Sequence, residues 1–191
     1  MNETVIGGKR VYLYDCTLRD GAQTQGVDFN AADKLAIAPE MDRLGFDYIE
    51  GGWPGANLTD DAFFANPPKL ASAKLTAFGM TRRAGRGPEN DPGLNALFST
   101  GIQTLCLFGK TWDFQVEVAL AIEADENVAM IADSVSLALK RVEEVVFDAE
   151  HFFDGYKSNP DYALACLNAA GEGGARWIVL CDTNGGTLPD E

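Results

Sequence analysis

The sequence is poor in basic residues, in cysteine and in histidine. Its 15 Lys or Arg face 29 Asp or Glu, a formal net charge of −14, which argues against a cationic surface for nucleic acid or for an anionic membrane. The single histidine, His151, has no second histidine at metal-ligand spacing. The cysteines form no Cys-x-x-Cys pair, and three lie in apolar runs, which indicates reduced, mostly buried thiols rather than disulfides or a zinc knuckle: Cys16, Cys106, Cys166 and Cys181.

Long hydrophobic runs are also missing. The first ten residues, MNETVIGGKR, contain no apolar signal-peptide core, and no window approaches the roughly 18 apolar residues that a membrane span needs. We therefore expect a cytoplasmic protein with no membrane partner. Its 46% hydrophobic and 10% aromatic content is enough to bury the core of one ordinary globular domain.

Six short apolar runs, rich in Val, Ile, Leu and aromatic residues, are typical of strands: 11–14, 48–50, 74–78, 104–108, 145–148 and 177–180. Helical patterns lie between them, over 31–44, 91–100, 114–122, 128–141 and 158–170. Asn30 is the expected N-cap of the first helix, Gly45 its end, and Pro39 is expected to kink or split it.

Strands that alternate with helices predict a parallel sheet. The runs begin about 33 residues apart, and eight such units would need about 260 residues, the size of a closed eight-stranded barrel. No strand is followed by a GxGxxG turn, which favours a barrel over a dinucleotide-binding sheet, and GEGG at 171–174 is expected to be a helix end and turn. The expected fold class is α/β, a TIM (β/α)8 barrel truncated after about the sixth strand, with residues 1–191 forming one incomplete catalytic domain.

Polar residues gather where the predicted strands end, which is where barrel enzymes place their chemistry. Asp15, Arg19 and Asp20 follow the first strand and offer an oxygen ligand for a hard cation beside a cation that can hold an oxyanion, although such a pair is also a common structural salt bridge. Five of the six strand ends carry such residues, which favours a catalytic mouth. His151 is interpreted as a capping or partly buried histidine between aromatic residues.

Six motifs along the chain resemble those of a known enzyme family. LYDCTLRDGAQTQG resembles the opening signature of the metal-dependent barrels of the HMG-CoA-lyase-like superfamily. YIEGGWPG, AFGMTRR, FGKTWDF, DAEHFFDGYKSNPDYAL and VLCDTNGGTLP resemble the citramalate synthase branch of the 2-isopropylmalate and homocitrate synthases. The resemblance runs from about residue 10 to the last residue.

The resemblance implies an acyltransferase of branched-chain amino-acid (isoleucine and leucine) biosynthesis. Such enzymes enolise acetyl-CoA, add it to a 2-oxo acid and hydrolyse the thioester, with a divalent metal, Mn, Mg or Zn, as Lewis acid. By motif, Arg19 would stabilise the developing oxygen charge, Asp20 would bind the metal and Gln23 would support it. Glu150 would lie by the reacting groups, and Thr183 would hydrogen-bond the oxo-acid carboxylate.

Substrate choice is expected to depend on apolar side chains of the third and fourth strands: Phe78, Met80, Leu105 and Leu107. The branch resemblance favours pyruvate as the oxo acid. Contacts to the phosphates of CoA must be local in so acidic a chain, and the candidates are Arg82, Arg83, Arg86 and Lys110, which could equally form a solvated basic loop.

The sequence departs from the family pattern after the sixth strand. The resemblance implies a metal-binding His-x-His pair on a seventh strand, which these residues lack, so we expect the 191-residue chain to have negligible synthase activity. An open six-stranded barrel would leave its first and last strands unpaired, so we expect self-association, as a homodimer or larger, or rearranged termini. Two alternatives stay open: a lyase that cleaves a 3-hydroxyacyl-CoA, and a non-catalytic chain that serves in binding or assembly.

Overall fold

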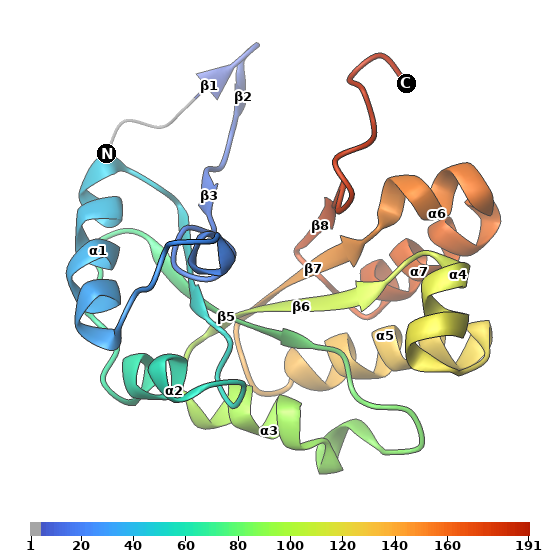
Figure 1. The fold of residues 1–191 in the computed structure, drawn as a ribbon, viewed down its shortest axis with the longest axis horizontal. Helices are drawn as coiled ribbons and strands as arrows, with labels where there is room; N and C mark the ends of the chain where they lie inside the picture. The colour runs from blue at the N-terminus through green and yellow to red at the C-terminus, as the bar shows by residue number, and fades with distance from the viewer. Residues whose placement is uncertain (1–4) are drawn as a thin grey trace.

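A computed structural model describes residues 5–191. Its centre is a six-stranded parallel sheet in the order β3-β4-β5-β6-β7-β8, the order of the chain, so each strand lies beside its predecessor. The strands are β3 (Tyr14–Asp15), β4 (Tyr48–Gly52), β5 (Lys74–Met80), β6 (Thr104–Lys110), β7 (Glu144–Glu150) and β8 (Trp177–Leu180). A separate antiparallel hairpin joins β1 (Val5–Ile6) to β2 (Lys9–Arg10). The large sheet is curled like part of a barrel, with β3 and β8 at its two borders (Figure 1).

Helices follow the strands and cover the convex side of the sheet (Figure 1). They are α1 (Ala31–Leu44), α2 (Leu58–Ala65), α3 (Pro92–Ser99), α4 (Asp113–Gln115), α5 (Ala124–Ala138), α6 (Phe152–Ser158) and α7 (Pro160–Glu172). Short 3₁₀ turns η1 (Gly21–Gln23) and η2 (Pro88–Asn90) and a π-helical turn η3 (Val116–Leu120) complete the order. The α/β prediction and the barrel-like strand order are confirmed.

Helix α1 has the predicted bounds. The Asn30 side chain accepts from the Asp33 N–H while the Asp33 side chain accepts from the Asn30 N–H, and Gly45 ends the helix at φ 93°. Pro39 was expected to kink or split this helix; it does not split it, because the helix is continuous from Ala31 to Leu44, and the expected kink stays a prediction. The predicted GEGG turn is confirmed, since α7 ends at Glu172 and Gly174 has φ 99°.

Other boundaries differ from prediction. The first strand of the sheet starts at Tyr14 rather than at residue 11, and the segment predicted as a helix over 114–122 is split between α4 and η3. Helix α2 was not predicted, although Asn57 caps it by accepting from the Asp60 N–H. Helix α6 was also missed, and Asn159, which caps α7, separates the two helices.

Two apolar clusters lie on opposite faces of the sheet. The larger fills the space between sheet and helices and includes Leu105, Leu107 and Phe147. The smaller lies on the inner, concave face and is formed by Phe78, Cys106 and Val146, with aromatic rings packed against them. In β6 and β7, side chains therefore alternate between the helix face and the inner face.

Within residues 5–191 no strand pairs with the outer edge of β3 or of β8. Ile178, Val179 and Leu180 of β8 are 36%, 38% and 45% exposed. The rings of Tyr12 and Trp177 lie 5.0 Å apart, so the two borders of the sheet approach each other at the amino ends of the strands. None of the helices described here has the length and apolar character that crossing a membrane would take. All four cysteines are free, and Cys106 and Cys166 are buried.

Candidate active site at the carboxyl ends of the strands

A cavity of about 520 Å³ opens at the carboxyl ends of the parallel strands. Five of the residues singled out by sequence line it, namely Arg19, Asp20, Gln23, Glu150 and Thr183, and so does the predicted substrate residue Phe78. These residues come from the ends of β3, β5, β7 and β8 and from the segments that follow them. The sheet therefore brings together groups up to 164 positions apart in the chain.

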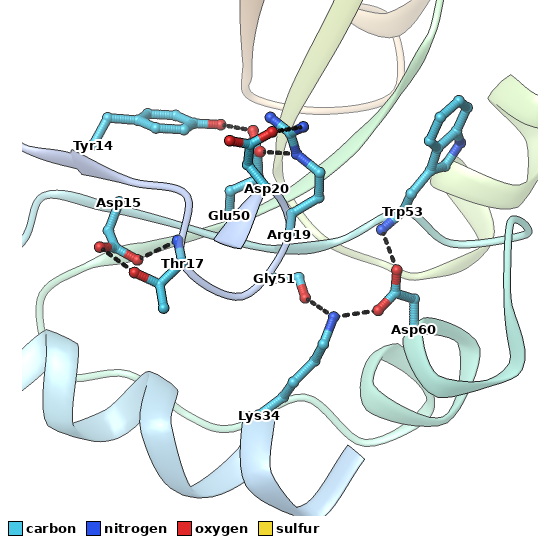
Figure 2. Close-up of polar contacts among 10 residues, drawn as sticks. All are labelled: Tyr14, Asp15, Thr17, Arg19, Asp20, Lys34, Glu50, Gly51, Trp53 and Asp60. Atoms are coloured by element: carbon cyan, nitrogen blue, oxygen red, sulfur yellow. Dashed lines mark hydrogen bonds and ion pairs between the residues drawn. The ribbon is translucent and has the colours of Figure 1, made fainter. Parts of the chain in front are cut away.

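Arg19 is fixed between two carboxylates. Its Nε donates to Oε1 of Glu50, and its Nη1 lies 3.0 Å from Oδ1 of Asp20 (Figure 2). The guanidinium carbon lies over the Phe78 ring, 3.8 Å from the ring centre. Glu50 is fully buried, and its second oxygen accepts from the Tyr14 hydroxyl at 2.6 Å. Burial and the nearby Glu50 carboxylate raise the pKa of Tyr14 well above its usual value. Both oxygens of Glu50 are thus occupied.

Asp15 is not in the cavity lining. Its carboxylate accepts from the Thr17 N–H at 2.9 Å and from the Thr17 hydroxyl at 3.0 Å, which closes the turn after β3 (Figure 2). Of the two aspartates flanking Arg19, only Asp20 reaches the site, and its side chain is 66% exposed.

One wall of the cavity is aromatic. The rings of Phe78 and Phe108 stack 5.0 Å apart, and Trp53 packs edge-on against both, at 5.6 and 5.3 Å. Leu105 and Leu107, predicted to line the substrate pocket, are fully buried on the helix face of β6 and do not reach it. The prediction chose the wrong face of β6, because the alternate residues Cys106 and Phe108 are the ones that face inward.

Met80, the remaining predicted pocket residue, is partly buried at the end of β5 and pairs in register with Phe108, but it is not in the cavity lining. Of the four predicted pocket residues, only Phe78 lines the cavity.

Two pairs fix the far side of the cavity. Lys110 of β6 binds Glu150 of β7 at 2.8 Å, and the backbone N–H of His151 donates to the Thr183 hydroxyl at 2.8 Å. His151 is the N-cap residue of α6, its side chain is 12% exposed, and its ring lies 5.9 Å from that of Trp112. The interpretation of His151 as a partly buried histidine at a helix cap is confirmed.

Asp148 was missed as a site residue by the sequence analysis. It lies on the inner face of β7, two residues before Glu150, and lines the cavity. Burial, together with the Glu50 carboxylate, raises the pKa of Asp148 to about 6, and burial raises the pKa of the neighbouring Cys106 thiol. The sequence could have indicated this, because Asp148 and Glu150 are two residues apart on one strand and their side chains must point to the same face.

The candidate phosphate contacts separate into two kinds. Arg82 is only 5% exposed and binds Glu126 at 2.8 Å and Asp133 at 2.9 Å, so its expected role in a solvated loop or at a phosphate is wrong. Lys110 forms an ion pair with Glu150. Arg83 and Arg86 are exposed in the loop after β5.

Oxygen donors for a divalent cation are present at the mouth. Asp20 offers a largely exposed carboxylate on the cavity lining, and the inner groups Glu50, Cys106 and Asp148 have potential ligand atoms within 4.8 Å of one another. Each Glu50 oxygen already accepts a hydrogen bond, from Arg19 or from Tyr14, so an ion at the inner cluster would compete with these two donors. Asp20 fits a hard cation best, since its carboxylate is accessible.

Sequence comparison with known proteins finds relatives among two groups of synthases. The chain is 52% identical over 185 residues to an (R)-citramalate synthase of Aquifex aeolicus and 52% identical over 183 residues to one of Geobacter sulfurreducens, covering 96% and 95% of this chain. It is 32% identical over 187 residues to 2-isopropylmalate synthase 1 of Caldanaerobacter subterraneus, covering 97% of this chain and 45% of that protein. The chain spans 35% of the length of the two citramalate synthases.

Solved structures support the fold. HMG-CoA lyase of Bacillus subtilis superposes with a TM-score of 0.74 at 17% identity, over 94% of this chain and 60% of that one. The hydroxymethylglutaryl-CoA lyase of Pseudomonas aeruginosa gives 0.72 at 18% identity, over 93% and 59%. Residues 10–191 match the HMGL-like family, and the chain belongs to that family.

Proposed function

We propose that these residues carry part of the active site of an acyltransferase that condenses acetyl-CoA with pyruvate to give citramalate. The observation that carries the proposal is the cavity that gathers Arg19, Asp20, Glu150 and Thr183, in a chain about half identical to (R)-citramalate synthases. Identity to the 2-isopropylmalate synthases is lower, 32–33%, which favours pyruvate over a branched 2-oxo acid.

The reaction makes one carbon–carbon bond and breaks one thioester. A base removes a proton from the acetyl methyl group, the enolate carbon attacks the keto carbon of the oxo acid, and the keto oxygen becomes a hydroxyl after taking up a proton. Water then cleaves the thioester and releases CoA. Negative charge develops first on the thioester oxygen and then on the former keto oxygen, so the site must supply fixed donors.

Arg19 is suited to meet that charge. Contacts to Glu50 and Asp20 and the stacking on Phe78 hold the guanidinium in place, while only its Nε and Nη1 are engaged in these contacts. Guanidinium has five N–H donors, so Nη2 can donate to a ligand oxygen. A donor held in advance costs no reorganisation when the charge forms.

Thr183 and Glu150 serve the other side of the ligand. Because the Thr183 hydroxyl oxygen accepts from His151, its own proton can be donated to the carboxylate of the oxo acid. Glu150 lies on the same cavity wall, oriented by Lys110, and in this proposal its carboxylate faces the reacting groups.

Asp20 would contribute one carboxylate ligand to a divalent metal, Mg²⁺, Mn²⁺ or Zn²⁺, with Gln23 beside it on the lining. Such an ion, when bound, polarises the keto carbonyl. The 191 residues contain a single histidine, so they hold no His-x-His pair.

The aromatic wall gives the pocket its selectivity in this proposal. Trp53, Phe78 and Phe108 would face the methyl group of pyruvate. One extra methylene changes binding in an apolar pocket by only about 1 to 3 kcal/mol, so selectivity depends on how firmly these rings are held. The enzyme would work in the cytoplasm, in branched-chain amino-acid biosynthesis, and its chains would associate as dimers or larger oligomers.

The test starts by reading the gene beyond the codon for Glu191. The full-length product and the 191-residue chain are then purified and assayed for CoA release with acetyl-CoA and pyruvate, 2-oxobutanoate or 2-oxoisovalerate. We expect the full-length protein to form citramalate and the 191-residue chain to show negligible turnover. Release of acetyl-CoA from a 3-hydroxyacyl-CoA, with no condensation, would replace the proposal by a lyase, and inactivity of the full-length protein in both directions would favour a binding or assembly role.

A further inference from the structure

A lysine and an aspartate on two outer helices form a buried ion pair directly behind the candidate site. Lys34 of α1 is 2% exposed and Asp60 of α2 is 5% exposed, and Lys34 Nζ donates to Oδ1 of Asp60. Removing two charges from water is costly, and an apolar pair of similar size often serves stability as well or better. The pair therefore calls for an explanation other than helix packing.

Its other contacts lie on the backbone that follows Glu50. Lys34 Nζ donates to the Gly51 carbonyl at 3.0 Å, and Oδ2 of Asp60 accepts from the Trp53 N–H at 2.8 Å (Figure 2). Asn57 supports the same oxygen at 2.9 Å. The pair thus hydrogen-bonds to the backbone of the residue before Gly52 and of the residue after it.

That stretch of chain is bent. The register between β4 and β5 shifts between Glu50 and Gly52, and Gly52 has φ 151°, a conformation that L side chains rarely adopt. A Cβ at Gly52 would lie 2.5 Å from the Asp60 carboxylate, so the backbone passes directly over it. A bend of this kind persists only where its surroundings hold it.

The two residues that flank the bend both belong to the cavity region. Glu50 receives Arg19 and Tyr14 on one side, and Trp53 packs against Phe78 and Phe108 on the other. The direction of the bend decides whether these two side chains point into the site. Lys34 does not line this cavity; together with Asp60 it lines a neighbouring cavity of about 310 Å³ that shares Arg19, Gln23 and Trp53 with the candidate site.

We infer that Lys34 and Asp60 are positioning residues: through the Gly51 carbonyl and the Trp53 amide they hold the bend that aims Glu50 at Arg19 and Trp53 at the aromatic wall. This inference rests on the proposed function for its catalytic consequence. The effect on the Trp53 ring follows from the contacts alone.

The experiment uses Lys34→Met and the milder Asp60→Asn in the full-length protein. Lys34→Met removes the donor to Gly51 and leaves Asp60 without a counter-ion, whereas Asp60→Asn keeps an acceptor for the Trp53 amide. A matched control is Lys74→Met, which breaks another lysine–carboxylate pair, to Glu144 at the opposite end of the strands. A second control is Arg43→Met, which removes an exposed pair on the same helix as Lys34.

Two readouts separate positioning from stability. The 191 residues contain three tryptophans, Trp53, Trp112 and Trp177, and labelling the full-length protein with 5-fluorotryptophan places a fluorine on each of them. Trp53→Phe then identifies the Trp53 signal by its disappearance. We expect Lys34→Met to move or broaden the Trp53 signal alone and to lower kcat by about 100-fold, as for a misplaced catalytic group, with little change in the KM for acetyl-CoA. Asp60→Asn should give the same pattern at smaller amplitude, and neither control should move the Trp53 signal.

A folded Lys34→Met or Asp60→Asn variant with the wild-type Trp53 signal overturns the inference. So does a loss of kcat that merely matches that of Lys74→Met at equal thermal stability. If the wild-type protein forms no product from any 2-oxo acid, the proposed function fails, and the fluorine signal still decides the positioning role.

Discussion

The backbone amide of His151 and the hydroxyl of Thr183, 32 residues apart in sequence, join the ends of β7 and β8 by a hydrogen bond of 2.8 Å. His151 makes this bond with φ 58°, and Ala121 is the only other non-glycine residue with positive φ in the part of the chain that the structure describes. Such backbone strain is commonly stored at functional sites. The Thr183 hydroxyl, which accepts this bond, lines the cavity, and under the proposed function it would donate its own proton to the oxo acid.

Thr183→Val tests that role, since valine keeps the shape and removes the hydroxyl. Loss of one hydrogen bond to a charged group costs about 1.5 to 3 kcal/mol, so kcat/KM for the 2-oxo acid should fall roughly 10- to 150-fold. This fall in kcat/KM should come from a higher KM for the oxo acid, while the KM for acetyl-CoA stays unchanged. Thr187→Val, outside the cavity lining, is the control, and equal kinetics of the two variants would contradict the assignment.

Arg19→Lys should be a severe change although it keeps the charge. Lysine cannot reproduce the fork that meets Glu50 and Asp20 together and still faces the cavity. Losing one donor to an oxyanion costs about 100- to 1,000-fold in kcat. Steady-state kinetics on the folded variant measure this, with Arg43→Lys on the surface of α1 as control. A kcat within a few-fold of wild type would show that Arg19 has a structural role only.

Much of the fold could be predicted from the sequence, because apolar runs and helix-capping residues are local features of the chain. The apolar run 177–180 coincides with β8, and α1 has its predicted ends because Asn30 and Gly45 carry the capping chemistry. Helix α2 escaped prediction because its eight residues, LTDDAFFA, span little more than two turns and are too few to show a helical period, so only its cap at Asn57 indicated it. The left-handed turn at His151 was not predicted, and its N–H bonds to the Thr183 hydroxyl, a contact between residues far apart in the chain that no local pattern shows.

The site was harder to predict at the level of side-chain direction. Strands of a barrel are buried on both faces, so a run such as Thr-Leu-Cys-Leu-Phe shows no apolar alternation to indicate which residues face inward. Leu105 and Leu107, expected at the substrate pocket, face the helices instead. Lys110 and Glu150 are polar residues at the strand ends, and their side chains point to the inner face. Side chains two residues earlier point to the same face, which correctly places Phe108 and Asp148 at the cavity.

Asp148 makes stability depend on pH. Its pKa is about 6 in the folded protein against 3.8 for an ordinary aspartate, so between those values the folded state keeps a proton that the unfolded state has lost. Stability is therefore lost as the pH rises from about 4 through 6. At pH 8 this penalty is up to about 3 kcal/mol.

Asp148→Asn removes the penalty and should raise the free energy of unfolding at pH 8 by up to that amount, about 3 kcal/mol, with little difference from wild type near pH 3.5. Urea unfolding at the two pH values measures it. Glu117→Gln, an exposed carboxyl in η3, should show no such gain. A destabilised Asp148→Asn variant at pH 8 would mean that the carboxylate is held by favourable contacts.

The outer edge of β8 should drive association of the 191-residue chain. Its backbone groups have no strand partner among residues 5–191, and Leu180 adds an apolar side chain that is 45% exposed. Unpaired edges with apolar side chains join other strands, and a lysine on the edge opposes this. Sedimentation velocity should therefore show dimers or larger species for the wild-type chain and a shift toward monomer for Leu180→Lys. Leu44→Lys, the same change at a 77% exposed position on α1, should leave association unchanged. A wild-type chain that stays monomeric at all concentrations would mean that this edge does not pair with another copy.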